Sequence, residues 1–176
     1  AFATGAGSPV SMLSSIQPVF EMTFGRGDSF PLWFALIALV SASGSLINAR
    51  LVVRVGMRGM IRRTLDVQMA LSAIMVAGTF GGFWPEGVAF AAFLVWTMAV
   101  FIMAGLTFGN VNAIAMEPMG HVAGTAASID ASVATIGAVA IAAPIGLAFD
   151  GTPGPLALGI LACVIAARLV MRRRPG

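Results

Sequence analysis

The stretch PLWFALIALVSASGSLINARLVVRVGMRGMIRR, residues 31–63, joins a long apolar run to a cluster of arginines. A helix over residues 31–53 is long enough to cross a bilayer, because about 20 residues at a rise of 1.5 Å each span the hydrocarbon core. Arginines directly after an apolar run are typical of a membrane helix that ends on the cytoplasmic side. The stretch therefore predicts an all-α membrane protein and gives a first indication of its orientation.

The composition of the whole chain indicates the same class. Of its 176 residues 59% are hydrophobic and 10% are charged, whereas a soluble domain has roughly a quarter of its residues charged. The arginines lie at the ends of apolar runs and form no basic face, so no nucleic-acid partner is expected. One histidine, one cysteine and the absence of known catalytic motifs predict no enzyme, no cofactor and no metal site.

Turn-rich segments divide the chain into six predicted membrane helices within one domain, residues 1–176. The segments GRGDSFP, FGGFWPEG and FDGTPGP combine glycine and proline, which interrupt helices. The first predicted helix is polar and contains Pro9 and Pro18, so it is expected to face protein or a cavity. The predicted helices cover residues 2–22, 31–53, 64–83, 87–113, 122–149 and 155–171.

The arginines predict how these helices are oriented. If six helices alternate in direction, nine arginines lie on one side of the membrane and Arg26 alone lies on the other. The positive-inside rule then makes the arginine-rich side cytoplasmic, with both chain ends there. The predicted location is the bacterial inner membrane, which the chain crosses several times.

Small residues predict which helices pack against protein. Residues 31–53 contain SASGS, and residues 122–144 contain no leucine, phenylalanine or methionine. Small side chains let helix backbones approach closely, so these two helices are expected to contact a second helical bundle. The helices at 64–83 and 155–171 carry large aliphatic residues and are expected to be outer, lipid-facing helices.

The segment GNVNAIAMEPMGHVAGTAAS, residues 109–128, resembles the junction between the tenth and eleventh helices of major facilitator superfamily drug exporters, and most closely their bicyclomycin/chloramphenicol-resistance (Bcr/CflA-like) subgroup. The segment SLINARL, residues 45–51, is similar to the loop after the eighth helix of that family, and GSPVSML, residues 7–13, to its seventh helix. The resemblance implies that this chain is the C-terminal six-helix half of a major facilitator superfamily fold.

The resemblance also implies a function. A C-terminal half of this kind belongs to a proton-coupled efflux antiporter for multiple drugs or other small apolar molecules, which binds substrate between two halves near the midplane. The expected partner is an N-terminal six-helix half, or another membrane subunit, contacted through helices 31–53 and 122–149. We accordingly expect the chain to be part of a longer polypeptide. The alternative is a truncated, transporter-like structural subunit of a larger membrane complex.

Candidate residues for the substrate and proton pathway are polar or aromatic side chains within apolar helices. Asn48, Asn110 and Asn112 need hydrogen-bond partners in lipid and are expected to face the bundle interior. Phe101 is a candidate for an apolar pocket. Asp130 lies about two turns into its helix, where a charge is costly and often functional, although it is also close enough to the cytoplasmic end to reach water or an arginine.

Candidates for a cytoplasmic gate lie in two predicted connections. Arg54 and Arg58 belong to the basic connection after residue 53, and Glu117 and His121 belong to the MEPMGH turn. Glu117 is expected either to lie in a simple turn or to pair with an arginine of the basic connection when the cytoplasmic side is closed. His121 is expected in the turn, with a role in proton transfer as the alternative.

A further acid, Asp66, is predicted to have a structural role. It lies in the first turn of the helix predicted at 64–83, where a negative charge is favourable, and close to Arg62 and Arg63.

Overall fold

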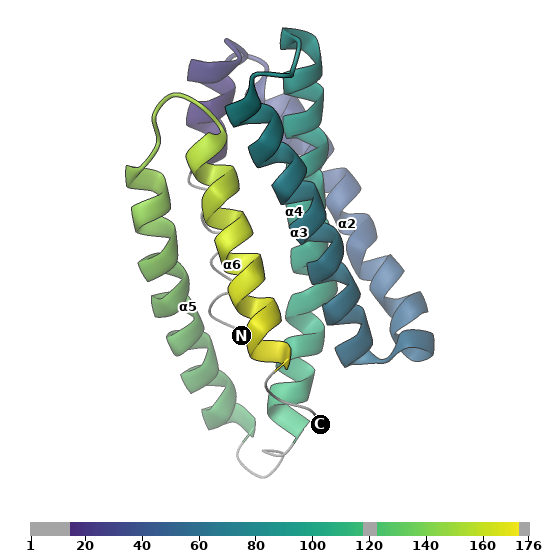
Figure 1. Ribbon diagram of the computed structural model, residues 1–176. Coiled ribbons are helices and arrows are strands. Elements are labelled where there is room, and N and C mark those ends of the chain that lie inside the picture. Colours follow the sequence, from purple (N-terminus) through teal and green to yellow (C-terminus); the bar gives the residue numbers. More distant parts are fainter. Residues whose placement is uncertain (1–14, 118–122, 173–176) are drawn as a thin grey trace.

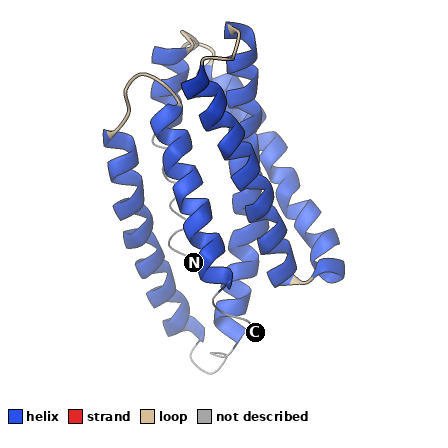
Figure 2. Ribbon diagram, in the orientation of Figure 1, coloured by secondary structure: helices blue, strands red, loops and turns tan. Residues whose placement is uncertain are grey.

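The computed structural model describes residues 15–117 and 123–172, and every regular element within these ranges is a helix (Figures 1 and 2). Residues 15–18 form a short helical turn that continues into a π-helical segment. The elements are η1 (Val19–Thr23), α2 (Phe30–Val55), α3 (Met57–Gly81), α4 (Glu86–Met116), α5 (Ala123–Leu147) and α6 (Gly154–Arg172).

Five of these helices, α2 to α6, are long and apolar enough to cross a membrane. This confirms an all-helical chain with the character of a multi-pass membrane protein. The first predicted helix, at 2–22, lies mostly outside the described residues, and only its last part is seen as residues 15–18 and η1. The other predicted helices agree with the observed ones to within a few residues, with one exception.

The exception is α3, which begins at Met57 instead of the predicted Thr64. The basic segment is therefore helical, and α2 and α3 are separated by Gly56 alone. Gly56 has φ 76° and ψ 155°, a conformation that L side chains rarely adopt. A single glycine thus turns the chain sharply, and Arg58, Arg62 and Arg63 are carried on the first turns of α3 rather than in a loop.

The helices alternate in direction, so that connections gather at two ends of the bundle (Figure 1). The connections before α2, before α4 and before α6 lie at one end, and Gly56 and the end of α6 lie toward the other. The described arginine side chains follow the predicted distribution, with Arg26 at the first end. Those at the opposite end are Arg50, Arg54, Arg58, Arg62, Arg63 and Arg168.

The core lies around α4, which packs against α2 on one side and α3 on the other. Its fully buried side chains include Phe93 and Val100, and they meet Phe20 of η1 and Ile160 of α6. Burial of such large apolar side chains is favourable wherever close packing replaces looser contacts with solvent or lipid.

The helices predicted at 64–83 and 155–171 to be outer, lipid-facing helices bury one face within the chain and expose large apolar side chains, such as Ile74 and Leu169, on another. The two corresponding helices, α3 and α6, pack closely along each other, and α3 also packs on α4. The helix α3 buries a continuous row of side chains at alternating spacings of three and four, a pattern that closely packed helices share. This row consists of Ile61, Leu65, Gln68, Ser72, Met75 and Gly78.

The helices α2 and α5 are the least covered, and they lie on opposite flanks of the bundle (Figure 1). In α2 only Ile37 and Gly44 are buried. In α5 only the alanines Ala134, Ala138 and Ala142 are buried among the side chains that the structure describes. These are the two helices that the small-residue pattern singles out, and most of their surface is left uncovered by the other described residues.

Candidate functional site

The clearest polar contact between helices in the apolar interior joins Asn48 of α2 to Asn110 of α4. The Asn110 Nδ2 donates to Asn48 Oδ1 at 2.7 Å and to the Leu106 carbonyl at 2.8 Å, and Asn48 Nδ2 donates to Asn110 Oδ1 at 3.4 Å. Asn110 is buried and Asn48 is half-buried. The two amides therefore satisfy each other, as buried polar groups must where water is scarce.

One turn from this pair, glycines let α2 and α4 approach closely. A Cβ atom placed on Gly44 would lie 3.2 Å from the Ile102 carbonyl oxygen, and one on Gly105 would lie 3.8 Å from the Gly44 backbone. Small residues at a helix crossing are the usual means of close packing in membranes. Gly44 and the asparagine pair together fix α2 against α4 at one crossing.

Beyond the crossing α2 and α3 diverge from Gly56 and leave a groove with a volume of about 350 Å³. Ile47, Leu51 and Val55 of α2 form one wall, and successive turns of α3 form the other. The floor is α4, which contributes Ala99, Ile102, Met103 and Leu106. The polar residues at the groove are Arg63, Thr64 and Gln68, all on the α3 wall. The groove is thus an apolar slot with its one charged side chain in α3, towards the arginine-rich end.

The predicted gate contact between Glu117 and an arginine is not formed. Glu117 is exposed, as are Arg54 and Arg58, and within residues 15–117 and 123–172 the recorded ion pair joins other residues. Asp130, half-buried on α5, likewise has no arginine partner there. His121 lies outside the described residues. The gate therefore stays a prediction, and its three described residues, Arg54, Arg58 and Glu117, form no ion pair with one another.

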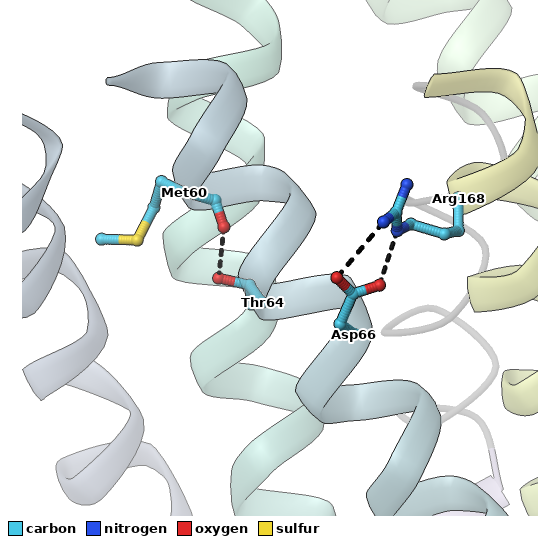
Figure 3. A network of polar contacts seen from close by, with 4 residues as sticks. All are labelled: Met60, Thr64, Asp66 and Arg168. Atoms are coloured by element: carbon cyan, nitrogen blue, oxygen red, sulfur yellow. Dashed lines mark hydrogen bonds and ion pairs between the residues drawn. The ribbon is translucent and has the colours of Figure 1, made fainter. Parts of the chain in front are cut away.

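The ion pair joins Asp66 of α3 to Arg168 of α6 (Figure 3). Arg168 Nε donates to Asp66 Oδ1 at 2.5 Å and Nη2 donates to Oδ2 at 3.3 Å, so the guanidinium holds the carboxylate with two bonds. The prediction that Asp66 lies in the first turn of its helix is wrong, because α3 begins at Met57. The role of Asp66 is structural, but it ties two helices together instead of capping one.

The remaining pathway candidates do not gather into one cluster. Asn112, expected in the bundle interior, is exposed on α4, because two residues rotate a helix by roughly 200° away from the buried Asn110. Phe101 is half-buried and packs edge-to-face on Phe34 at 6.5 Å between ring centroids. Asp130 lies on α5, away from the asparagine pair. Of the five candidates, the structure brings together Asn48 and Asn110.

A buried polar cluster that the sequence analysis does not identify joins α3 to α4. Trp96 Nε1 donates to the Ser72 hydroxyl at 3.0 Å, and Gln68 Nε2 donates to the same oxygen at 3.2 Å. All three side chains are almost fully buried. The sequence signal is the placement of Gln68 and Ser72 four residues apart in an otherwise apolar helix, which indicates a polar face turned toward protein.

At the end opposite the arginine cluster, aromatic side chains close the bundle. Phe20, Phe24 and Trp33 each contact Phe90 edge-to-face, with ring centroids 5.2–5.6 Å apart. The Arg26 guanidinium carbon lies 4.3 Å from the Phe90 centroid, a cation–π contact. Arg26 is thus positioned by aromatic rings, whereas at the other end only Arg168 of the described arginines forms an ion pair.

The connection between α5 and α6 is ordered by its own polar side chains. The hydroxyl of Thr152 donates to Asp150 Oδ1 at 2.7 Å, and the Thr152 N–H donates to the same oxygen at 3.0 Å. These bonds, the hydroxyl first, lower the pKa of Asp150 below its ordinary value, because they stabilise the carboxylate. Thr23 donates to the Gly151 carbonyl at 2.7 Å and so ties this connection to η1.

Comparisons of the chain with family models, with curated proteins and with solved structures found no match. The site is therefore interpreted from the chain's own residues.

Proposed function

We propose that this chain is one half of a membrane transporter, which exports small apolar molecules in exchange for protons. The observation that carries the proposal is the surface of α2 and α5. Both helices have the length and composition of membrane spans. Small and hydroxylated residues are prominent on the exposed surface of α5, whereas on α2 they lie among large exposed aliphatic side chains such as Leu39, Leu46 and Val53. Lipid-facing surfaces do not require such residues, whereas helix–helix interfaces do. The exposed small residues of α5 are suited to contact with a second helical bundle, and this supports the proposed architecture of two halves.

The exposed small residues follow a regular pattern on α5. Gly124, Ser128, Ala131 and Thr135 are all exposed, and they recur every three or four residues on one face. The hydroxyls of Ser128, Ser132 and Thr135 bond carbonyls within α5 itself, so they present little polarity outward. A smooth face of this kind allows another helix to approach and to slide. That property suits the interface between two halves that rock about a central site.

The crossing of α2 and α4 supplies the rigid part of this half. Reciprocal amide bonds between Asn48 and Asn110 and the close approach at Gly44 hold the two helices in one register. By contrast, α5 touches α4 and α6 at few places. In the proposed cycle α2 and α4 move as one body, and Asp130 on α5 takes up and releases the proton where α5 meets the second half.

The test is proton-driven export of a lipophilic cation, such as ethidium, into everted membrane vesicles that contain the complete protein. Asp130→Asn removes the titrating carboxyl and is expected to lower the export rate about tenfold or more, because a neutral amide does not carry the coupled proton. Asp28→Asn is the matched control, because Asp28 is an exposed carboxylate in the connection before α2. Its export rate is expected to stay within twofold of the unmodified protein. Unchanged export and an unchanged pH profile in Asp130→Asn contradict the coupling role.

The same uncovered surfaces also favour a second candidate, a transporter-like structural subunit of a larger membrane complex. Ser132→Cys on the exposed face of α5 and Thr97→Cys in the buried core of α4 separate the possibilities. A bifunctional thiol-to-amine cross-linker is expected to join a neighbouring helical bundle to Ser132→Cys and not to Thr97→Cys under either function. Capture together with proton-driven export identifies the transporter, and capture of a separate subunit without export identifies the structural role.

A further inference from the structure

The groove between α2, α3 and α4 has the form of a binding site that none of the transport roles uses. It arises because α2 and α3 diverge at Gly56 while both remain packed on α4. Ile47 and Leu51 on its rim are partly exposed, and Ile102 and Leu106 lie in its floor. A volume of about 350 Å³ equals that of roughly a dozen water molecules at ~30 Å³ each, which is enough for much of an acyl chain.

The charge at the groove is uncompensated. Arg63 lines it, and within residues 15–117 and 123–172 neither Arg63 nor its neighbours Arg58 and Arg62 form an ion pair. No lining residue is acidic. The nearest acid along α3, Asp66, is already bonded to Arg168. The positive charge at the groove is therefore available for an anion from outside the chain.

The position of Arg63 suits a headgroup at the membrane surface. Arg63 lies seven residues after Gly56, about 10 Å along α3 from the end of the bundle. An arginine side chain covers much of this distance by extending its stem along apolar surface toward the interface. Thr64, the next residue, also lines the groove, but its hydroxyl already donates to the Met60 carbonyl at 2.9 Å, so the Arg63 guanidinium is the group that meets an anion there (Figure 3).

We propose that the groove binds an anionic phospholipid of the arginine-side leaflet, with its phosphate at Arg63 and one acyl chain between α2 and α3. Basic pockets between membrane helices recognise anionic headgroups through this combination of apolar slot and terminal arginine. Charge and shape indicate the occupant. The α4 floor and the α2 wall of the groove are apolar, and the one charged residue that lines it, Arg63, is positive. This proposal requires the chain to lie in a membrane and is independent of the transport function.

The experiment measures lipid retention by native mass spectrometry of the purified chain in detergent micelles. Dioleoyl-phosphatidylglycerol is the anionic probe and dioleoyl-phosphatidylcholine is the zwitterionic reference. Arg63→Gln removes the charge that lines the groove. Arg62→Gln removes an equal charge from the adjacent position, which is rotated roughly 100° around the helix and does not line the groove. Ala99→Phe places a ring in the floor of the groove without changing any charge.

The unmodified chain is expected to retain one phosphatidylglycerol at least about fivefold more tightly than phosphatidylcholine, since one arginine near a lipid headgroup contributes about that factor. Arg63→Gln is expected to abolish this preference, Arg62→Gln to keep it, and Ala99→Phe to weaken retention of both lipids. Equal affinity for the two lipids in the unmodified chain overturns the proposal. Equal losses in Arg62→Gln and Arg63→Gln also overturn it, because general charge attraction then accounts for the binding.

A variant's thermal unfolding midpoint, measured in the same detergent, identifies any loss due to misfolding, and Ala99→Phe then tests the groove independently of Arg63.

Discussion

The interface between α3 and α4 and the surface of α5 differ in almost every physical respect. Between α3 and α4, large aromatic side chains pack around a polar cluster in which Ser72 accepts two hydrogen bonds. The helix α5 buries three alanines, and its larger side chains, such as Ile136 and Leu147, point away from the rest of the chain. Both helices of the first pair and α5 itself have the composition of membrane spans.

The difference shows that hydrophobicity places a helix in a membrane but does not specify its neighbours. The polar cluster between α3 and α4 is satisfied, because Gln68, Ser72 and Trp96 find hydrogen-bond partners in one another. The α5 surface makes few contacts within this chain and gains close packing only when another helix covers it. The contrast therefore distinguishes a core that is closely packed within the described residues from a helix surface that they leave largely uncovered. The predictions measure how differently the two regions respond to substitution.

Truncation of a core side chain has the largest expected effect. Phe93 is 0% exposed, and Phe93→Ala is expected to lower the free energy of unfolding by about 3–5 kcal/mol, because it leaves a large cavity. Ile136 on α5 is 70% exposed, and Ile136→Ala is expected to change the free energy of unfolding by less than about 0.5 kcal/mol. Unfolding of the detergent-solubilised chain by sodium dodecyl sulfate measures both values. A comparable cost for the two variants contradicts the contrast, since it requires α5 to be packed as deeply as α4.

Removal of a buried acceptor has the next largest effect. Ser72→Ala leaves the Trp96 N–H and the Gln68 amide without their shared acceptor, and is expected to cost about 1–2 kcal/mol. Ser132→Ala on α5 removes a hydroxyl that bonds its own helix, and is expected to be neutral or slightly stabilising. The same unfolding measurement applies. In addition, Trp96 fluorescence is expected to change in Ser72→Ala and to stay constant in Ser132→Ala.

The sequence predicts the helices well because their signal is local. An apolar run bounded by glycine, proline and arginine determines where a span lies, so helices α2, α4, α5 and α6 appear within a few residues of their predicted bounds. The start of α3 is predicted too late, because the composition of the basic segment is typical of a loop. Arginine is in fact a good helix former, and Gly56 alone is enough to turn the chain.

Contacts between helices are predicted less well, because they depend on rotation about each helix axis. The inward position of Asn48 and Asn110 follows from the cost of an unpaired amide in lipid, and the structure pairs the two. The same argument fails for Asn112, which lies on the other side of α4 and is exposed near the helix end. The partner of Asp66 comes from α6, 102 positions later, and no local pattern indicates such a contact.

The ion pair between Asp66 and Arg168 provides a smaller test of the closely packed part of the molecule. Its side chains are partly exposed, so a double-mutant cycle of Asp66→Asn and Arg168→Gln is expected to give a coupling of about 0.2–1 kcal/mol. Arg26→Gln, which removes an arginine at the opposite end of the bundle, is expected to show no coupling to Asp66→Asn. A coupling of zero for the first pair indicates that apolar packing alone holds α3 against α6.

The smallest expected effect concerns the connection that carries α5 back to the bundle. Thr152 holds the pKa of Asp150 below its ordinary value, so the folded connection favours the charged carboxylate. The stabilisation is present above the ordinary carboxyl pKa and is lost as the pH falls through the lowered value. Thr152→Val is expected to return the pKa of Asp150 toward its ordinary value, and Thr152→Ser to keep it low, because serine retains the hydroxyl donor. Carbon-13 NMR of the aspartate carboxyls against pH measures the shift. A pKa unchanged in Thr152→Val indicates that Thr152 does not order the connection, and that the Thr23 bond to the Gly151 carbonyl is the main attachment of α5 at this end.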